Sequence, residues 1–138
     1  MYYLKIVIDL IFKNDDYYKK LKIKCNYLYL KWDLIKSFYL KQKNYDDVII
    51  SASPTFLLEP ICRRLNITYL IASKVDKHTG KYTGINCYGS EKVRRFKEIF
   101  PNQSIDNFYS DSLSDAPIAK LAKHAFLVSK KHIKNWEP

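Results

Sequence analysis

Residues 108–117 read FYSDSLSDAP, a short polar loop with carboxylates at Asp111 and Asp115. The residues before the loop, 105–109, are partly apolar, and those after it, 117–124, carry apolar side chains at helical spacing. This pattern indicates a strand, a loop and the start of a helix. Ligands of open α/β sheets collect at the carboxyl ends of strands, so an acidic pair here could hold a metal. The same residues could instead be a turn residue and a helix N-cap, both common positions for aspartate.

An α/β unit precedes this loop in the first half of the chain. Residues 48–50 read Val-Ile-Ile, a β-branched run that is typical of a strand buried in a parallel sheet. The run ends at Ser51, and Ser53 followed by Pro54 predicts the start of a helix that continues to about residue 65.

A second unit begins with the apolar residues 69–72. Residues 74–84 contain a Lys-His-Thr-Gly turn, which predicts a hairpin. A helix is then expected over residues 91–100, and residues 125–128 are expected to form a closing strand. Lys92 lies at the start of that helix, where a cation gains nothing from the helix dipole, so it could be an ordinary solvated lysine. Strands alternating with helices predict an α/β fold with a Rossmann-like, doubly wound parallel sheet.

The composition is that of a folded domain with a basic bias. The chain has 138 residues, 47% of them hydrophobic and 15% aromatic, which excludes wholesale disorder and suffices for one domain with a core. The formal net charge is +10, but the lysines are scattered along the chain and form no dense basic run. We therefore expect no nucleic-acid partner. The interleaved lysines and tyrosines of residues 17–45 leave single-stranded nucleic-acid binding as an alternative.

The cysteines Cys25, Cys62 and Cys87 are far apart and form no Cys-x-x-Cys pair. Such spacing argues against a disulfide framework and a structural zinc site, and it favours a reduced, cytoplasmic location. The apolar run at residues 2–12 is much shorter than the roughly 20 residues that span a bilayer. It also lacks a small-residue cleavage site, so we expect neither a membrane segment nor a signal peptide.

The first 45 residues differ from the rest because they contain neither glycine nor proline. Within them, residues 28–39 carry apolar side chains at intervals of four, three and four, which predicts an amphipathic helix. We therefore expect two regions, a helical segment over residues 1–45 and an α/β core over residues 46–138.

In this order along the chain, the polar residues resemble those of the haloacid dehalogenase-like (HAD) phosphatases, in particular the branch that looks like phosphoserine phosphatase. Ser51 resembles the Ser/Thr that hydrogen-bonds a phosphoryl oxygen, and Lys92 resembles the lysine that neutralises the phosphoryl group. Asp111 and Asp115 resemble the acidic loop that holds Mg²⁺, with Asp111 as inner ligand and Asp115 acting through water or by orienting Lys92. The resemblance covers residues 46–130 and implies Mg²⁺ as cofactor and a phosphorylated small-molecule substrate.

The family's nucleophile motif, Asp-x-Asp on the central strand, does not occur in this sequence. In one explanation, residues 1–45 are the later part of a helical cap, and the HAD core is incomplete because the chain starts downstream of the nucleophile strand. Two inner strands would then lack partners, which predicts poor stability or self-association through an exposed sheet edge. In the other explanation, residues 5–9 fill the central strand with Asp9 as nucleophile, and Ile11 occupies the acid/base position, where it cannot transfer a proton.

We therefore predict a fragment of a HAD-like phosphatase, that is, a phosphomonoester hydrolase that depends on Mg²⁺ in its complete form. Alone it is expected to be inactive, because an aspartyl nucleophile carries the covalent phosphoenzyme. The alternative is a non-catalytic module that keeps Ser51, Lys92 and Asp111 as a cradle for phosphate and metal.

Overall fold

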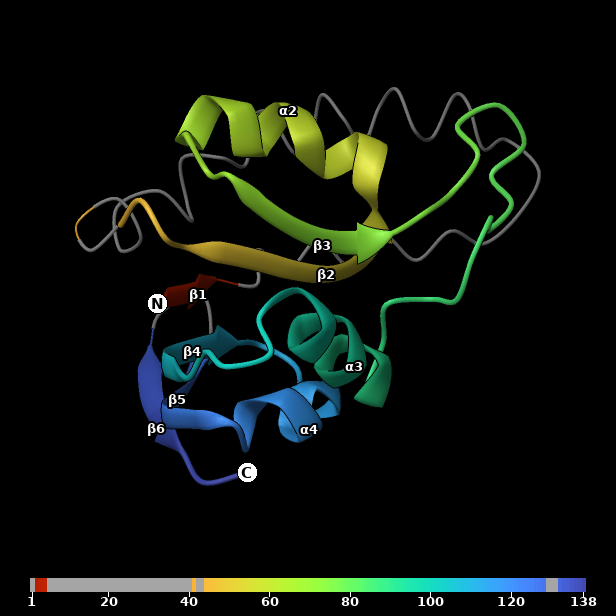
Figure 1. The fold of residues 1–138 in the computed structure, drawn as a ribbon. Coiled ribbons are helices and arrows are strands. Elements are labelled where there is room, and N and C mark those ends of the chain that lie inside the picture. Colours follow the sequence, from red (N-terminus) through yellow and green to blue (C-terminus); the bar gives the residue numbers. More distant parts are fainter. Residues whose placement is uncertain (1, 5–40, 42–43, 129–131) are drawn as a thin grey trace.

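The computed structural model describes residues 2–4, 41, 44–128 and 132–138, which form one sheet with helices packed on it (Figure 1). No helix among these residues is long and apolar enough to cross a membrane. The sheet has the strand order β3-β2-β1-β4-β5-β6. The strands are β1 (Tyr2–Leu4), β2 (Val48–Pro54), β3 (Tyr69–Ser73), β4 (Ile105–Ser110), β5 (Ala122–Val128) and β6 (Ile133–Trp136). The helices are α2 (Thr55–Leu65), α3 (Ser90–Ile99) and α4 (Ala116–Ala119), and a 3-10 turn, η1 (Leu113–Asp115), precedes α4.

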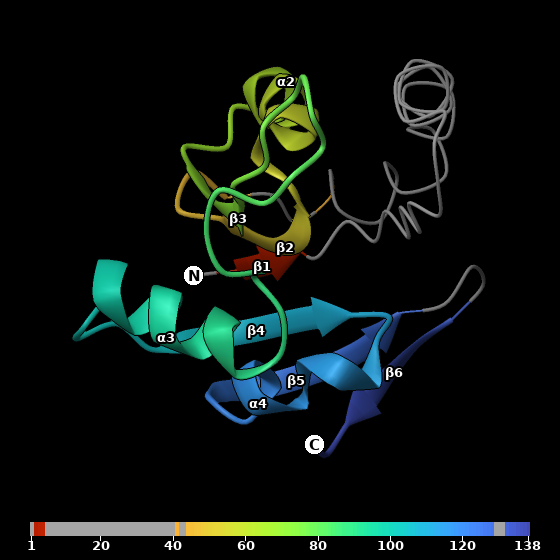
Figure 2. The same ribbon diagram turned by 90° about the vertical axis from the view of Figure 1, so that its right-hand side faces the viewer.

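Strand β2 is buried on both faces of the sheet. Val48 and Ile50 belong to a core cluster that also contains Phe96 of α3 and Ile118 of α4. Ile49 lies between them and is 1% exposed, and it faces the opposite side because side chains alternate along a strand. Helix α2 packs against β2 and β3, whereas α3 and α4 lie beside β4 and β5 in both views (Figure 1, Figure 2). The α/β class and the doubly wound parallel sheet predicted from the sequence are therefore confirmed.

The centre of the sheet is occupied by β1. It pairs in parallel with β2, where Tyr3 is opposite Val48, and in parallel with β4, where Tyr3 is opposite Phe108. The expectation that two inner strands would lack ladder partners is therefore wrong for the described residues, because residues 2–4 are themselves extended and fill that position. This short part of the predicted helical segment belongs to the core sheet. Asp9 and the predicted helix at residues 28–39 lie outside the described residues.

The chain after residue 116 also differs from the prediction. Its apolar spacing predicts a helix over residues 117–124, but α4 ends at Ala119 and β5 begins at Ala122. Ala122 is already opposite Ile105 of β4, so the backbone hydrogen bonds of the sheet replace those of a longer helix. Strand β6 was not predicted, and it pairs antiparallel with β5 at the sheet edge.

The hairpin predicted at residues 74–84 is confirmed by an antiparallel bridge between Val75 and Tyr82. A carboxylate oxygen of Asp76 accepts hydrogen bonds from the backbone N–H groups of His78 and Thr79 at 2.7 and 2.9 Å. Gly80 has a φ of 72°, a left-handed conformation that glycine adopts without strain. The hairpin is part of the long connection that leads from β3 to α3.

Candidate functional site

A buried ion pair joins α3 to the loop after β4. Lys92 Nζ donates a hydrogen bond to Asp115 Oδ1 at 2.5 Å, and the two side chains are 1% and 0% exposed. The second carboxylate oxygen, Oδ2, accepts a hydrogen bond of 2.7 Å from Ser110 Oγ. Because both oxygens of Asp115 are engaged in this way, the lysine is held in place and its charge is compensated.

Local structure explains how these two side chains meet. Gly89, at the N-cap of α3, has a φ of 54°, which glycine adopts without strain, and Lys92 in the first turn of the helix is 1% exposed. Asp115 ends η1 and stands at the N-cap of α4, but in the described part of the chain its side chain makes no capping hydrogen bond. Asp115 therefore occupies the N-cap position that the alternative gave it, but its carboxylate binds Lys92 and does not cap the helix.

Ser110 is a member of this group that the sequence alone did not single out. Its hydroxyl, which is fully buried, accepts a hydrogen bond from the backbone N–H of Ser112 at 3.0 Å and donates to Asp115. The serine thereby fixes both the turn after β4 and the second oxygen of the carboxylate. The sequence did offer one sign of this role, since Ser110 is the last residue of the strand before the acidic loop. Serine is common in turns for reasons of backbone geometry alone, so this position does not single it out.

The other predicted residues lie at the same edge of the sheet. Ser51 is 2% exposed, and its Oγ accepts a hydrogen bond of 3.1 Å from the backbone N–H of Ser53. The register of β2 against β3 shifts between Ser51 and Pro54, which marks an irregularity at this end of the strand. Asp111 follows β4 directly and is exposed. Because β2 and β4 both run parallel to β1, Ser51 and Asp111 lie at the carboxyl end of the sheet, where ligands of open α/β sheets bind.

The donor set fits Mg²⁺ only in part. Within residues 2–4, 41, 44–128 and 132–138, no group of three or more His, Cys, Asp or Glu side chains could hold a metal ion. Asp115 uses both oxygens for Lys92 and Ser110, which leaves Asp111 as the exposed carboxylate at this edge. Mg²⁺ commonly takes one or two carboxylates and completes its shell with waters and phosphate oxygens. Asp111 can therefore supply one protein ligand of such a site.

Cys87 lies within electrostatic range of the ion pair. Its side chain is fully buried, and burial raises the pKa of the thiol, while the nearby charges of Arg95 and Lys92 act in the opposite direction. The raised pKa keeps the thiol protonated near neutral pH, so it lacks the thiolate character of a reactive cysteine.

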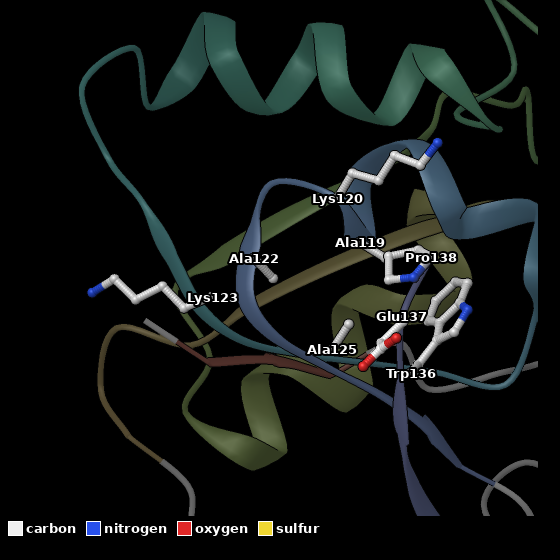
Figure 3. Close-up of a pocket in the computed structure, with 8 residues that line it drawn as sticks. All are labelled: Ala119, Lys120, Ala122, Lys123, Ala125, Trp136, Glu137 and Pro138. Atoms are coloured by element: carbon white, nitrogen blue, oxygen red, sulfur yellow. The ribbon is translucent and has the colours of Figure 1, made fainter.

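A hollow of about 320 Å³ lies between the end of α4 and strands β5 and β6 (Figure 3). Figure 3 shows Trp136, Glu137 and Pro138 together on one side, while Lys123 points away from them. Lys123 pairs with Asp106 at 2.6 Å on the surface. The hollow contains none of the residues that the sequence singled out. Its lining is Ala119, Lys120, Ala122, Lys123, Ala125, Trp136, Glu137 and Pro138.

Comparison with known proteins gives a consistent result. A family model described as haloacid dehalogenase-like hydrolase matches residues 29–120, more than half of the chain. A probable phosphatase of Mycobacterium tuberculosis is 33% identical over 91 residues, which are 61% of this chain and 32% of the relative. A histidinol-phosphatase of Neisseria meningitidis serogroup C is 25% identical over 96 residues, 61% of this chain and 43% of the relative. The chain thus spans between about a third and under half of these relatives.

A structural comparison supports the fold alone. The crystal structure of a protein with unknown function from Bordetella pertussis Tohama I is similar with a TM-score of 0.51 and 20% sequence identity. The match covers 78% of this chain and 57% of that chain.

Proposed function

This chain belongs to the haloacid dehalogenase-like hydrolase family, and we propose that it carries the phosphate-binding half of a Mg²⁺-dependent phosphomonoester hydrolase. The observation that carries the proposal is the buried ion pair of Lys92 with Asp115, at the edge of the sheet where Ser51 and Asp111 also lie. The substrate class, a phosphorylated small molecule, is also part of the proposal.

Each residue has a role that follows from its chemistry. The ammonium group of Lys92 supplies positive charge and hydrogen bonds to phosphoryl oxygens, and the hydroxyl of Ser51 supplies a further donor. Asp115 holds Lys92 in position, and Ser110 holds Asp115. Phosphoryl transfer depends mainly on positioning and charge stabilisation, so a rigid, buried lysine suits it better than a solvated one.

Mg²⁺ would be held by Asp111 together with waters and oxygens of the phosphoryl group. When bound, it would supply charge that offsets the negative oxygens of the substrate. Asp111 is suited to this role because it is exposed at the carboxyl end of β4, next to the fixed turn made by Ser110 and Ser112.

The Asp-x-Asp motif, which carries the family's nucleophile, is the part that this sequence lacks. Since no Asp-x-Asp is present, we propose that the chain alone binds phosphate without turning over a phosphate ester. The second candidate, a non-catalytic module for phosphate and metal, is favoured by the same absence. We also propose a cytoplasmic location for the chain. Among the described residues, Cys62 and Cys87 are buried free thiols, which agrees with this part of the proposal.

The test measures binding and turnover in the same preparations. We expect the chain to bind inorganic phosphate in calorimetric titration, more tightly with Mg²⁺ than with EDTA, and not to hydrolyse p-nitrophenyl phosphate. Lys92→Gln should abolish binding under conditions where urea titration shows it to be folded, whereas Lys123→Gln, which changes an exposed lysine, should not. A native chain that binds no phosphate would refute the proposal.

A variant that creates an Asp-x-Asp motif at residues 9–11, Ile11→Asp, separates the two candidates, because β1 already occupies the central position of the sheet. Hydrolysis of p-nitrophenyl phosphate by that variant supports the hydrolase. Phosphate binding by the folded variant without hydrolysis supports the binding module instead.

A further inference from the structure

The long connection between β3 and α3 is closed at its base by a side chain of β3. Ser73, the last residue of the strand, donates a hydrogen bond from Oγ to Asn86 Oδ1 at 2.9 Å. Ser73 Oγ also accepts a hydrogen bond from the backbone N–H of Cys87, at 2.9 Å. Ser73 and Cys87 are both fully buried. The two ends of the connection, which Figure 1 shows as the long green loop, are thus joined next to the start of α3.

Arg95, in the second turn of α3, joins the same two ends from the other side. Its Nη1 donates to the carbonyl oxygen of Ala72 at 2.8 Å, and its Nη2 donates to the carbonyl oxygen of Ile85. Its Nε donates to Glu91 Oε1 at 2.9 Å, within the same helix. Three nitrogens of one guanidinium therefore bind three different acceptors, on β3, on the loop and on α3.

We propose that Arg95 is a positioning residue for Lys92, an inference that rests on the proposed function. The two residues are three apart on α3, so they belong to the same stretch of rigid helix. On one side Arg95 fastens the helix to the end of β3 and to the loop, and on the other side Lys92 reaches Asp115. A shift of the helix by a fraction of its pitch would move Lys92 Nζ relative to Asp115, and small misplacements of this kind weaken positioning strongly.

The geometry requires arginine specifically. A lysine ammonium also has three N–H donors, but all three are on one nitrogen, so it cannot reach the three separated acceptors that Arg95 binds through Nε, Nη1 and Nη2 of its planar guanidinium. Two of the three acceptors are backbone carbonyls, so their positions are set by the fold and not by another flexible side chain.

Arg94 provides a matched control on the same helix. It also binds Glu91, at 2.8 Å, but its other described partner is Glu98, at 2.9 Å, and its side chain is 57% exposed. Arg94→Gln therefore removes the same charge and a contact with the same glutamate, while the contacts of Arg95 to Ala72 and Ile85 remain.

The experiment compares the native chain with Arg95→Gln, Arg95→Lys and Arg94→Gln. The affinity for inorganic phosphate in the presence of Mg²⁺ is measured at a temperature at which urea titration shows each variant to be fully folded. We expect Arg95→Gln and Arg95→Lys to bind phosphate about 10-fold more weakly than the native chain, because mutating residues that support the ligands of a site lowers affinity by about 10-fold or more. Arg94→Gln should bind phosphate as the native chain does. Hydrogen exchange at the amide of Cys87 should become faster in the two Arg95 variants, while exchange in β4 and β5 stays unchanged.

The outcomes separate the positioning role from the proposed function. If the native chain binds no phosphate, the proposed function fails, and the positioning role fails with it. If the native chain binds phosphate and the Arg95 variants bind it equally well, only the positioning role is overturned. Equal weakening by Arg94→Gln would also overturn it, since a general loss of charge would then explain the effect. Low millimolar guanidinium ion should restore part of the affinity of an Arg95→Ala variant, which a purely global loss of stability would not allow.

Discussion

Removing the ammonium group of Lys92 is expected to destabilise the fold strongly. In a Lys92→Met variant the aliphatic part of the side chain remains, but the fully buried charge of Asp115 loses its ion pair of 2.5 Å with the ammonium group. Its hydrogen bond from Ser110 at 2.7 Å persists and compensates only part of that loss. Breaking a buried ion pair by removing one partner costs about 3–5 kcal/mol. This is a large share of the roughly 5–15 kcal/mol by which a domain is stable.

The chain contains a control pair of the same chemistry. Lys123 binds Asp106 at 2.6 Å, but the two side chains are 62% and 45% exposed. An exposed pair of this kind contributes about 0–1 kcal/mol, so Lys123→Met should leave stability nearly unchanged. The two substitutions delete the same group at nearly the same distance, and the main difference between the two pairs is their burial.

Urea unfolding, followed by circular dichroism, measures both effects. With a slope of about 2 kcal/mol/M, the Lys92→Met variant should unfold at a urea concentration about 2 M lower than the native chain. The double variant Lys92→Met with Asp115→Leu should recover much of this loss, because it leaves no unpaired buried charge. Equal shifts of the urea midpoint for Lys92→Met and Lys123→Met would refute the reasoning. A double variant whose loss of stability equals the sum of the losses measured for Lys92→Met and Asp115→Leu alone would refute it too.

Three further predictions concern titration, thiols and metal. Hydrogen bonds from two arginines of α3 lower the pKa of Glu91 to about 2. The lowered pKa of Glu91 stabilises the folded state fully at pH values above 4.5, the pKa in the unfolded chain, and this stabilisation is lost as the pH falls toward 2. The urea midpoints of the native chain and of Glu91→Gln should therefore differ at pH 6 and converge toward pH 3. Burial raises the pKa of Cys62 to about 11 and also raises that of Cys87. In a Cys25→Ser variant both remaining thiols should therefore react slowly with Ellman's reagent at pH 8 until urea unfolds the chain, and rapid reaction of that folded variant would contradict this. Asp111→Asn should reduce the effect of Mg²⁺ on phosphate binding in calorimetric titration, while the free energy of unfolding changes by no more than about 0.5 kcal/mol because the side chain is exposed.

Much of the fold could be predicted because its signals are local. The β-branched run at residues 48–50 is strand β2, and the helix expected over residues 91–100 is α3, displaced by a single residue. The helix expected after residue 116 could not be judged in the same way. Its apolar spacing is helical, but the partner that converts residues 122–124 into a strand is β4, and sheet pairing depends on residues distant in the sequence.

The candidate site shows the same division between local and distant information. The resemblance to HAD phosphatases singled out Lys92 and Asp115, and the structure places their side chains in contact at 2.5 Å, while the orienting role of Asp115 stays a prediction. Nothing in the sequence around either residue shows that they are in contact. Ser110 was missed because its role lies in a hydrogen bond to a carboxylate five residues later, and Arg95 was missed because two of its acceptors are backbone carbonyls. Every residue has a backbone carbonyl, so the residue type gives no sign that it accepts such a hydrogen bond.

The central position of β1 has a consequence for the folding kinetics of the chain. Units such as β2-α2-β3 are local and can form early, but the sheet becomes continuous only when Tyr3 lies between Val48 and Phe108. These contacts close very long loops, so the chain loses entropy before the pairing of the strands stabilises it. We therefore expect the rate-limiting step of folding to be the insertion of residues 2–4, so that the shortest described strand determines when the two halves of the sheet become one cooperative unit.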